Sequence, residues 1–131
     1  MESVFGAQNW VIEQGDDLAY PEGAASGKGR IALRNNTSQT QRFVTRLITP
    51  AMDLSKLTAQ PMLVFSHAQQ QRLGDVDVLR IYYRTAPNGR WVQLAEYNQK
   101  IVKWQADTIL LDAYNTKTYQ IAFEGTDQFG S

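Results

Sequence analysis

The most regular alternation of apolar and polar residues in the chain lies at residues 79–84. Successive side chains of an extended strand point to opposite faces, so one face carries Leu79, Ile81 and Tyr83. The other face carries Arg80, Tyr82 and Arg84. This alternation predicts a half-buried strand of an antiparallel sheet, with one of the two sets in the core.

A chain reversal is predicted directly after this strand, at the sequence APNG of residues 86–89. Proline presets φ at one turn position, and Asn-Gly supplies residues that tolerate positive φ. The chain can then return along WVQL, residues 91–94. Residues 75–91 therefore predict a β-hairpin with Pro87 and Gly89 at its tip.

Other segments combine β-branched and aromatic residues with boundaries of Gly, Pro, Asn or Ser, which is typical of short strands. These strands are expected at residues 9–13, 30–34, 42–48, 61–68, 108–112 and 118–124. In the strand at residues 61–68, Leu63, Phe65 and His67 share one face. In the strand at residues 118–124, Tyr119, Ile121 and Phe123 face inward. Residues 51–60 are expected to form a crossover loop with at most one helical turn.

About eight short strands, regular turns and no convincing helix predict an all-β fold. We expect a two-sheet antiparallel β-sandwich of the jelly-roll type. The 131 residues fit a single domain, residues 1–131. No strand follows the final GTDQFGS. We therefore expect one module of a larger protein, cut before its last strand.

Composition excludes several classes of function. Thirteen basic and thirteen acidic residues leave no net charge, so a nucleic-acid partner and a polybasic membrane module are not expected. The absence of cysteine excludes disulfides, thiolate metal sites and a cysteine nucleophile. No apolar run approaches the length of a membrane span, and residues 1–14 lack the charged and apolar regions of a signal peptide. We expect the signal of an exported protein to lie outside this sequence.

Four segments follow one another in a distinctive order: LITP with MDLS after it, PMLVFSHA, DVLRIYYRT with NGRWVQL, and ILLDAYNTKTYQIAFEG. In this order and spacing, over about residues 30–125, they resemble the MAM-like jelly rolls of bacterial surface proteins, the group of cleaved-adhesin and choice-of-anchor domains. The resemblance implies a non-catalytic adhesion or carbohydrate-binding module of a secreted or surface protein. Its implied partners are a glycan or surface protein and neighbouring domains of the same chain.

The resemblance also implies calcium, held in many members by an acidic N-terminal loop and an Asp-Asp pair on the last strand. Here the acidic loop is reduced to Gly15, Asp16 and Asp17, and that last strand is not present. Calcium needs several oxygen ligands, which Asp16, Asp17 and Glu22 supply in part, with backbone carbonyls for the remainder. Asp75 and Asp77 lie two residues apart, so they face the same side and form a second candidate metal or sugar site. The alternatives are a solvated acidic loop and a solvated strand end.

Aromatic residues are the other candidate ligand-binding groups, because their faces stack on sugar rings while nearby polar groups bond the hydroxyls. We select Trp104 and Tyr82 as exposed candidates, together with Trp91 after the hairpin turn. The alternative for each is packing in the core or at its rim, where large aromatic residues are usually found.

Catalysis is not expected. Ser66, His67 and the acidic residues at 75 and 77 do not make a triad, because adjacent strand residues point to opposite faces. His67 is better explained as a core or interface histidine bonded to a neighbour. Pairs such as Glu96 with Asp112 or Glu124 require a measured separation before they indicate a glycosidase. A structural β-sandwich spacer that contacts neighbouring domains is the alternative to a binding module.

Overall fold

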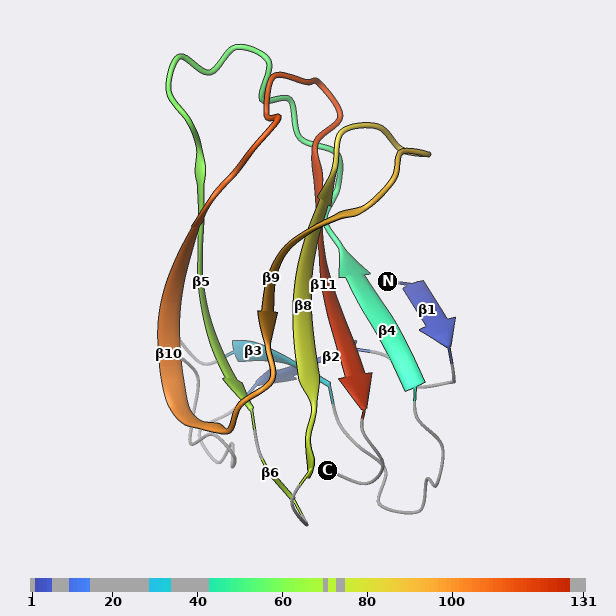
Figure 1. The fold of residues 1–131 in the computed structure, drawn as a ribbon, viewed down its shortest axis with the longest axis vertical. Helices are drawn as coiled ribbons and strands as arrows, with labels where there is room; N and C mark the ends of the chain where they lie inside the picture. Colours follow the sequence, from blue (N-terminus) through green and yellow to red (C-terminus); the bar gives the residue numbers. More distant parts are fainter. Residues whose placement is uncertain are drawn as a thin grey trace.

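The computed structural model describes residues 2–5, 10–14, 29–33, 43–69, 71, 72 and 75–127. These residues form eleven strands without a helix (Figure 1). The strands are β1 (Glu2–Phe5), β2 (Trp10–Gln14), β3 (Gly29–Leu33), β4 (Phe43–Ile48), β5 (Met62–Gln69), β6 (Gln71–Arg72), β7 (Asp75–Val76), β8 (Val78–Arg84), β9 (Val92–Tyr97), β10 (Ile101–Leu110) and β11 (Gln120–Asp127). In this described part, no helix could cross a membrane. The predicted all-β class is confirmed.

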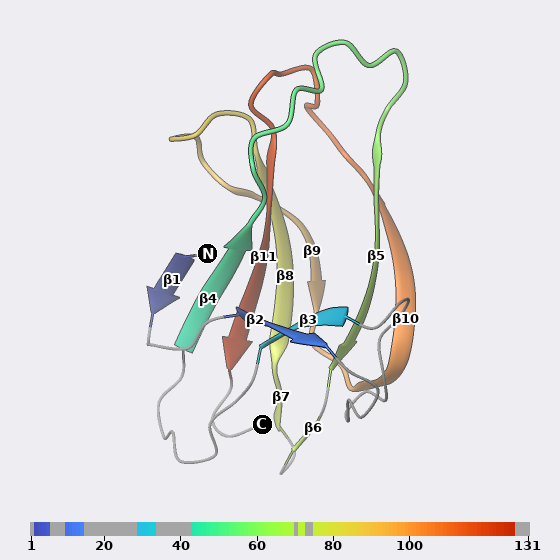
Figure 2. The ribbon, with the colours of Figure 1, turned by 180° about the vertical axis from the view of Figure 1, so that it is seen from behind.

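The principal sheet has five strands in the order β1-β4-β11-β8-β9, and every neighbouring pair is antiparallel. β11, almost the last part of the chain, lies between β4 and β8. Three further antiparallel pairs accompany this sheet: the β5–β10 ribbon, the β2–β3 hairpin and the short β6–β7 ribbon. Figure 2 shows the long β5–β10 ribbon beside the five-stranded sheet from the back.

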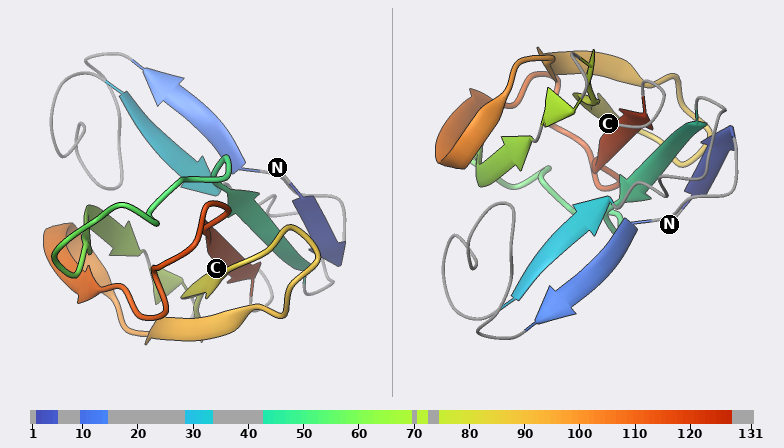
Figure 3. Two further views of the ribbon diagram at one scale, coloured as in Figure 1. Left: turned by 90° about the horizontal axis from the view of Figure 1, so that it is seen from above. Right: turned by 90° about the horizontal axis from the view of Figure 1, so that it is seen from below.

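The β5–β10 ribbon and the β2–β3 hairpin lie on the same side of the five-stranded sheet (Figure 3). β11 contacts both through one face. The ring of Phe123 meets that of Phe65 on β5, with centroids 5.9 Å apart. Two residues further, Gly125 lies against Leu33 and Trp10 of the β2–β3 hairpin. This two-layer packing makes the fold sandwich-like.

The core is centred on four buried residues: Ile81, Leu111, Tyr119 and Ile121. Phe65 connects the layers, because its ring also meets Tyr97 on β9 edge-on, with centroids 6.0 Å apart. Tyr119 and Tyr83 stack in parallel, 5.4 Å apart. The faces predicted for Leu79 to Tyr83 and for Tyr119 to Phe123 are therefore the core faces, as the alternation indicated.

Most predicted strands are confirmed within one or two residues, but the one at residues 108–112 is wrong at both ends. β10 begins at Ile101 and ends at Leu110. Its pairing with β5 is interrupted between Ile101 and Gln105, where the register shifts. This irregularity breaks the two-residue period and hides the strand in the sequence. The strands β1, β6 and β7 were not predicted either.

The hairpin between β8 and β9 is confirmed, but its turn does not use positive φ. The amide of Gly89 donates to the carbonyl of Ala86 at 2.8 Å, which closes the reversal around Pro87 and Asn88. Among the described residues other than glycine, only Ala113 has positive φ, at 49°. Proline at the second turn position suffices here, because it presets the φ of an ordinary reversal.

Gly125 is a position on β11 at which the β2–β3 hairpin leaves no room for a side chain. A Cβ atom placed there would overlap Cδ2 of Leu33 and lie 3.2 Å from Cζ2 of Trp10. We expect Gly125→Val to lower the free energy of unfolding by about 1 to 3 kcal/mol, the usual cost of overpacking. Gly125→Ala should cost less, because the flexible end of Leu33 can move. Urea unfolding measures both; equal stability of the valine variant and the wild type would contradict this packing.

Candidate functional site

The face of the five-stranded sheet opposite the core gathers arginine and aromatic side chains. The strand register places Arg80 and Arg46 on either side of Glu124, and Arg84 opposite Gln120. Directly opposed residues of antiparallel strands share a face, so these side chains are neighbours. We call this surface the arginine-aromatic face; it comprises Arg46, Arg80, Tyr82, Arg84, Trp91, Gln120 and Glu124.

Glu124 anchors the arginine-aromatic face and its side chain is only 7% exposed. Oε2 accepts a hydrogen bond from Nε of Arg46 at 2.7 Å. Oε1 accepts from the Tyr82 hydroxyl at 3.4 Å and lies 3.6 Å from Nη1 of Arg80. Arg80 also pairs with Glu96, with 3.6 Å between Nη2 and Oε1. A buried carboxylate needs such partners, so Glu124 fixes three neighbouring side chains.

The structure brings together two of the three aromatic residues predicted to bind a ligand. Cζ of Arg46 lies 5.3 Å from the ring centroid of Tyr82 and 6.0 Å from that of Trp91. Cζ of Arg84 lies 4.2 Å from the centroid of Trp91. These distances are those of cation–π contacts. Tyr82 and Trp91 therefore belong to one cluster, connected by Arg46.

Tyr82 stays neutral at physiological pH. Burial, followed by the negative charge of Glu124, raises the pKa of its phenol above the usual value. The protonated hydroxyl is what allows Tyr82 to donate to Glu124. The face thus offers guanidinium and hydroxyl donors at a half-buried sheet surface, which are groups suited to a polar or anionic ligand.

Arg84 differs from the other two arginines in having neutral partners. Its Nε donates to Oε1 of Gln120 at 2.8 Å. Gln120 is itself fixed, because its Nε2 donates to the carbonyl of Thr49 at 3.0 Å. Trp91 supplies the other contact of the guanidinium. Arg84 is therefore held in one orientation at the end of β8.

Trp104, the third predicted aromatic residue, lies apart from this cluster. It belongs to β10, which is outside the five-stranded sheet. Like Tyr82, the residue is half-buried rather than exposed as predicted. Its Nε1 is buried and has no hydrogen-bond partner in the described structure. Trp104 is part of the β5–β10 ribbon, and the structure records no contact between it and the arginine-aromatic face.

Of the candidate metal residues, only Asp75 and Asp77 lie within the described part of the chain. Asp16 and Asp17 lie outside the described residues. Asp75 belongs to β7, and the half-buried Asp77 follows it, with its carbonyl accepting from Nε2 of Gln69. Within the described ranges, no three His, Cys, Asp or Glu residues form a group that could hold a metal ion. Calcium binding stays a prediction.

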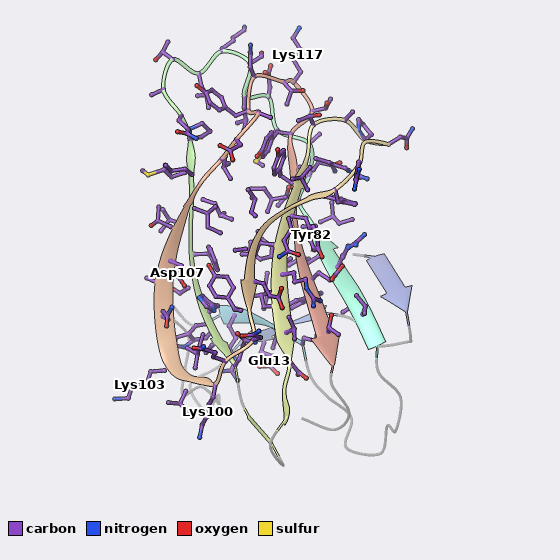
Figure 4. The ribbon with its side chains drawn as sticks, viewed as in Figure 1. Glu13, Tyr82, Lys100, Lys103, Asp107 and Lys117 are labelled. Carbon is purple, nitrogen blue, oxygen red and sulfur yellow. The ribbon has the colours of Figure 1, made fainter. Side chains whose placement is uncertain are left out.

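A second polar cluster lies inside the β5–β10 ribbon. His67 is buried, and its Nε2 is bonded to Oδ2 of Asp107, which lies on β10 two residues beyond Gln105, the residue directly opposite His67. Its ring lies 4.2 Å from that of Tyr97. Ser66 is exposed, so the two residues do point to opposite faces. The prediction of a core or interface histidine bonded to a neighbour is confirmed as a core histidine, with Asp107 as the partner. Figure 4 labels Asp107 on β10.

Asp107 makes folding depend on pH. Hydrogen bonds from His67 and then Gln105 lower the pKa of its carboxyl below the usual value. A carboxylate with a lower pKa in the folded state stabilises that state above its unfolded pKa of about 4, and this contribution is lost as the pH falls further. We expect Asp107→Asn to be less stable than the wild type at pH 7, with the difference shrinking at pH 3.

Urea unfolding at the two pH values measures this difference. Asp53 provides the control, because its pKa is also lowered but by hydrogen bonds from Ser55, only two residues away. A local bond of this kind persists more readily in the unfolded chain, so Asp53→Asn should show a weaker pH dependence. A difference for Asp107→Asn that stays constant from pH 7 to pH 3 would contradict the assignment.

Sequence reasoning missed Arg46, Glu124 and Gln120 as parts of the candidate site. Arg46 and Glu124 are 78 residues apart, and only the pairing of β4 with β11 joins them. The available signal was the alternation itself: Gln120 and Glu124 alternate with the inward Tyr119, Ile121 and Phe123. The same alternation placed Arg80, Tyr82 and Arg84 correctly away from the core.

Comparison with known proteins adds no relative. No family model, no curated protein and no solved structure matches this chain. The resemblance to MAM-like modules therefore stays a prediction from the order of four sequence segments.

Proposed function

We propose that this chain is a non-catalytic binding module that recognises a glycan or a glycosylated surface protein through the arginine-aromatic face. The supporting observation is the convergence of Tyr82 and Trp91 on Arg46, on the sheet face opposite the core. Aromatic and guanidinium groups side by side are typical of surfaces that bind polar ligands.

The proposal extends to fold and location. The sandwich-like packing and the sequence resemblance both favour a jelly roll of the MAM-like group. Modules of this group belong to secreted or surface-anchored bacterial proteins, so we place the parent protein outside the cell. In this proposal Trp91 orients Arg84, Tyr82 completes the surface beside Arg46, and calcium is a structural ion at the acidic residues near the N-terminus.

The test compares two tryptophan variants on a glycan array. We expect Trp91→Ala to reduce binding at least roughly tenfold, or by on the order of 1.4 kcal/mol, since Arg84 loses the ring that orients it. Trp104→Ala should bind as the wild type does, because it belongs to the other layer. Circular dichroism and unfolding temperature establish that both variants fold. Loss of binding in Trp104→Ala alone would refute the assignment to this face.

A structural spacer is the second candidate, and one surface favours it. The outer side of the β5–β10 ribbon exposes Met62, Val64, Val102 and Leu110, each more than half accessible. Met62 and Leu110 are directly paired, so their side chains adjoin. A covering domain of the same polypeptide would remove this apolar area from water. Stable association with its own flanking domains, without binding to any glycan, would favour the spacer.

A further inference from the structure

Arg84 carries a positive charge that the described protein does not neutralise. Arg46 and Arg80 both pair with Glu124, and Arg80 also pairs with Glu96. Among the residues that the structure describes, no carboxylate pairs with Arg84; its contacts are Gln120 and the ring of Trp91. A half-buried guanidinium without a counter-ion is a surface prepared for an anion.

The orientation of Arg84 decides which of its atoms meet that anion. Nε is used by Gln120, so the two terminal nitrogens, Nη1 and Nη2, keep their four N–H donors. Trp91 covers one face of the planar group at 4.2 Å, and Gln120 is held in turn by the carbonyl of Thr49. The guanidinium is therefore fixed before a ligand arrives, which reduces the entropy lost on binding.

A carboxylate fits this arrangement well. Two parallel N–H···O bonds from a guanidinium edge match the two oxygens of a planar carboxylate. Arg84 also covers a face of the Trp91 indole, so stacking of a neutral sugar on that face is not available. Arg46 binds Glu124 through Nε, and its Cζ lies 6.0 Å from the centroid of Trp91, so its terminal nitrogens are left near that ring for sugar hydroxyls. Charge recognition therefore dominates over stacking at this position.

We propose that Arg84 binds the carboxylate of an acidic sugar, of the uronic-acid type, on the arginine-aromatic face. This inference rests on the proposed glycan-binding function and narrows its ligand class. Trp91 and Gln120 act as positioning residues that hold the guanidinium, and the carboxylate of the sugar takes the place of the missing counter-ion.

The experiment uses tetragalacturonate and its fully methyl-esterified form, which have the same sugar stereochemistry and differ in charge. Isothermal titration at low ionic strength measures the affinity of each for the wild-type protein. We expect the acid to bind roughly tenfold or more tightly than the ester, because charge-assisted hydrogen bonds are stronger than neutral ones. Added salt should reduce the difference in affinity between the acid and the ester, since an ion pair at a solvent-accessible surface is screened.

Two variants locate the effect. Arg84→Gln should bind acid and ester equally, because glutamine lacks the charged guanidinium whose two parallel N–H groups bind a carboxylate. Arg90→Gln removes the same charge at an exposed position of the loop that follows β8, and should keep the preference. Unfolding temperatures of both variants establish that they are folded. A third variant, Arg84→Lys, keeps the charge but loses the two parallel N–H donors of the guanidinium, so it should keep only part of the preference.

Several results would overturn the inference and are distinguishable from failure of the proposed function. If the wild type binds acid and ester equally, the proposed glycan binding still holds, but recognition of the carboxylate charge by Arg84 is refuted. If Arg84→Gln still prefers the acid to the ester, another residue recognises the carboxylate. Binding of neutral glycans alone refutes the acidic ligand. Arg84-dependent binding of polyglutamate but of no saccharide refutes the sugar class, and absence of all saccharide binding refutes both proposals together.

Discussion

Replacement of Tyr119 by alanine is expected to lower the free energy of unfolding by about 3 to 5 kcal/mol, the usual cost of removing a large aromatic ring from a core. Tyr119 is fully buried and belongs to the central cluster with Ile81. Its ring stacks in parallel on Tyr83 at 5.4 Å. Its backbone also forms a bridge to Met52, with N–H···O distances of 2.8 and 2.9 Å.

Tyr119→Phe separates the ring from the hydroxyl. The hydroxyl donates to the carbonyl of Asp112 at 3.0 Å. Asp112 is exposed, so water can donate to this carbonyl when the hydroxyl is removed. We therefore expect the phenylalanine variant to lose only about 1 kcal/mol. Chemical unfolding measures both variants. If alanine and phenylalanine destabilise equally, the ring is not the main stabilising part, and the description of the core is wrong.

Glu124→Ala is expected to lower the free energy of unfolding by about 2 to 3 kcal/mol. Removal of one partner from a fully buried ion pair usually costs more, because the other charge is left in a dry environment. Here the side chains of Arg46 and Arg80 are 19% and 23% exposed, so water can reach both. This access places the expected loss below that of a fully buried pair.

The matched control for Glu124 is Glu96. Its side chain is 36% exposed and its ion pair with Arg80 spans 3.6 Å. Surface pairs of this kind contribute about 1 kcal/mol or less, so Glu96→Gln should be nearly neutral. Urea unfolding of the two variants gives the comparison. Equal losses at the two positions would show that Glu124 does not anchor the arginine-aromatic face.

Both predictions concern residues whose faces could be derived from the sequence. The alternation at residues 79–84 and 118–124 placed Ile81 and Tyr119 in the core, since a strand buried on one face must repeat every two residues. It also placed Arg80, Tyr82 and Arg84 together on the opposite face. Local patterns determined these assignments, because each depends only on neighbours along one strand.

The partners of those residues could not be derived in the same way. The site depends on β11 lying between β4 and β8, and strand order is a long-range property that no single segment encodes. Trp91 and Trp104 each lie near a strand in the sequence, yet only Trp91 reaches Arg84. The register shift in β10 changes the period around Trp104, so its face could not be read from alternation.

The central claim is that ligand binding occurs on the arginine-aromatic face. The most direct measurement follows the indole N–H signals of the three tryptophans by nitrogen-15 NMR while tetragalacturonate is added. Variants with each tryptophan replaced by phenylalanine assign the signals. We predict that the Trp91 signal shifts with saturation while that of Trp104 stays in place. A saturable shift of Trp104 with Trp91 unchanged would contradict it and move the binding site to the β5–β10 ribbon.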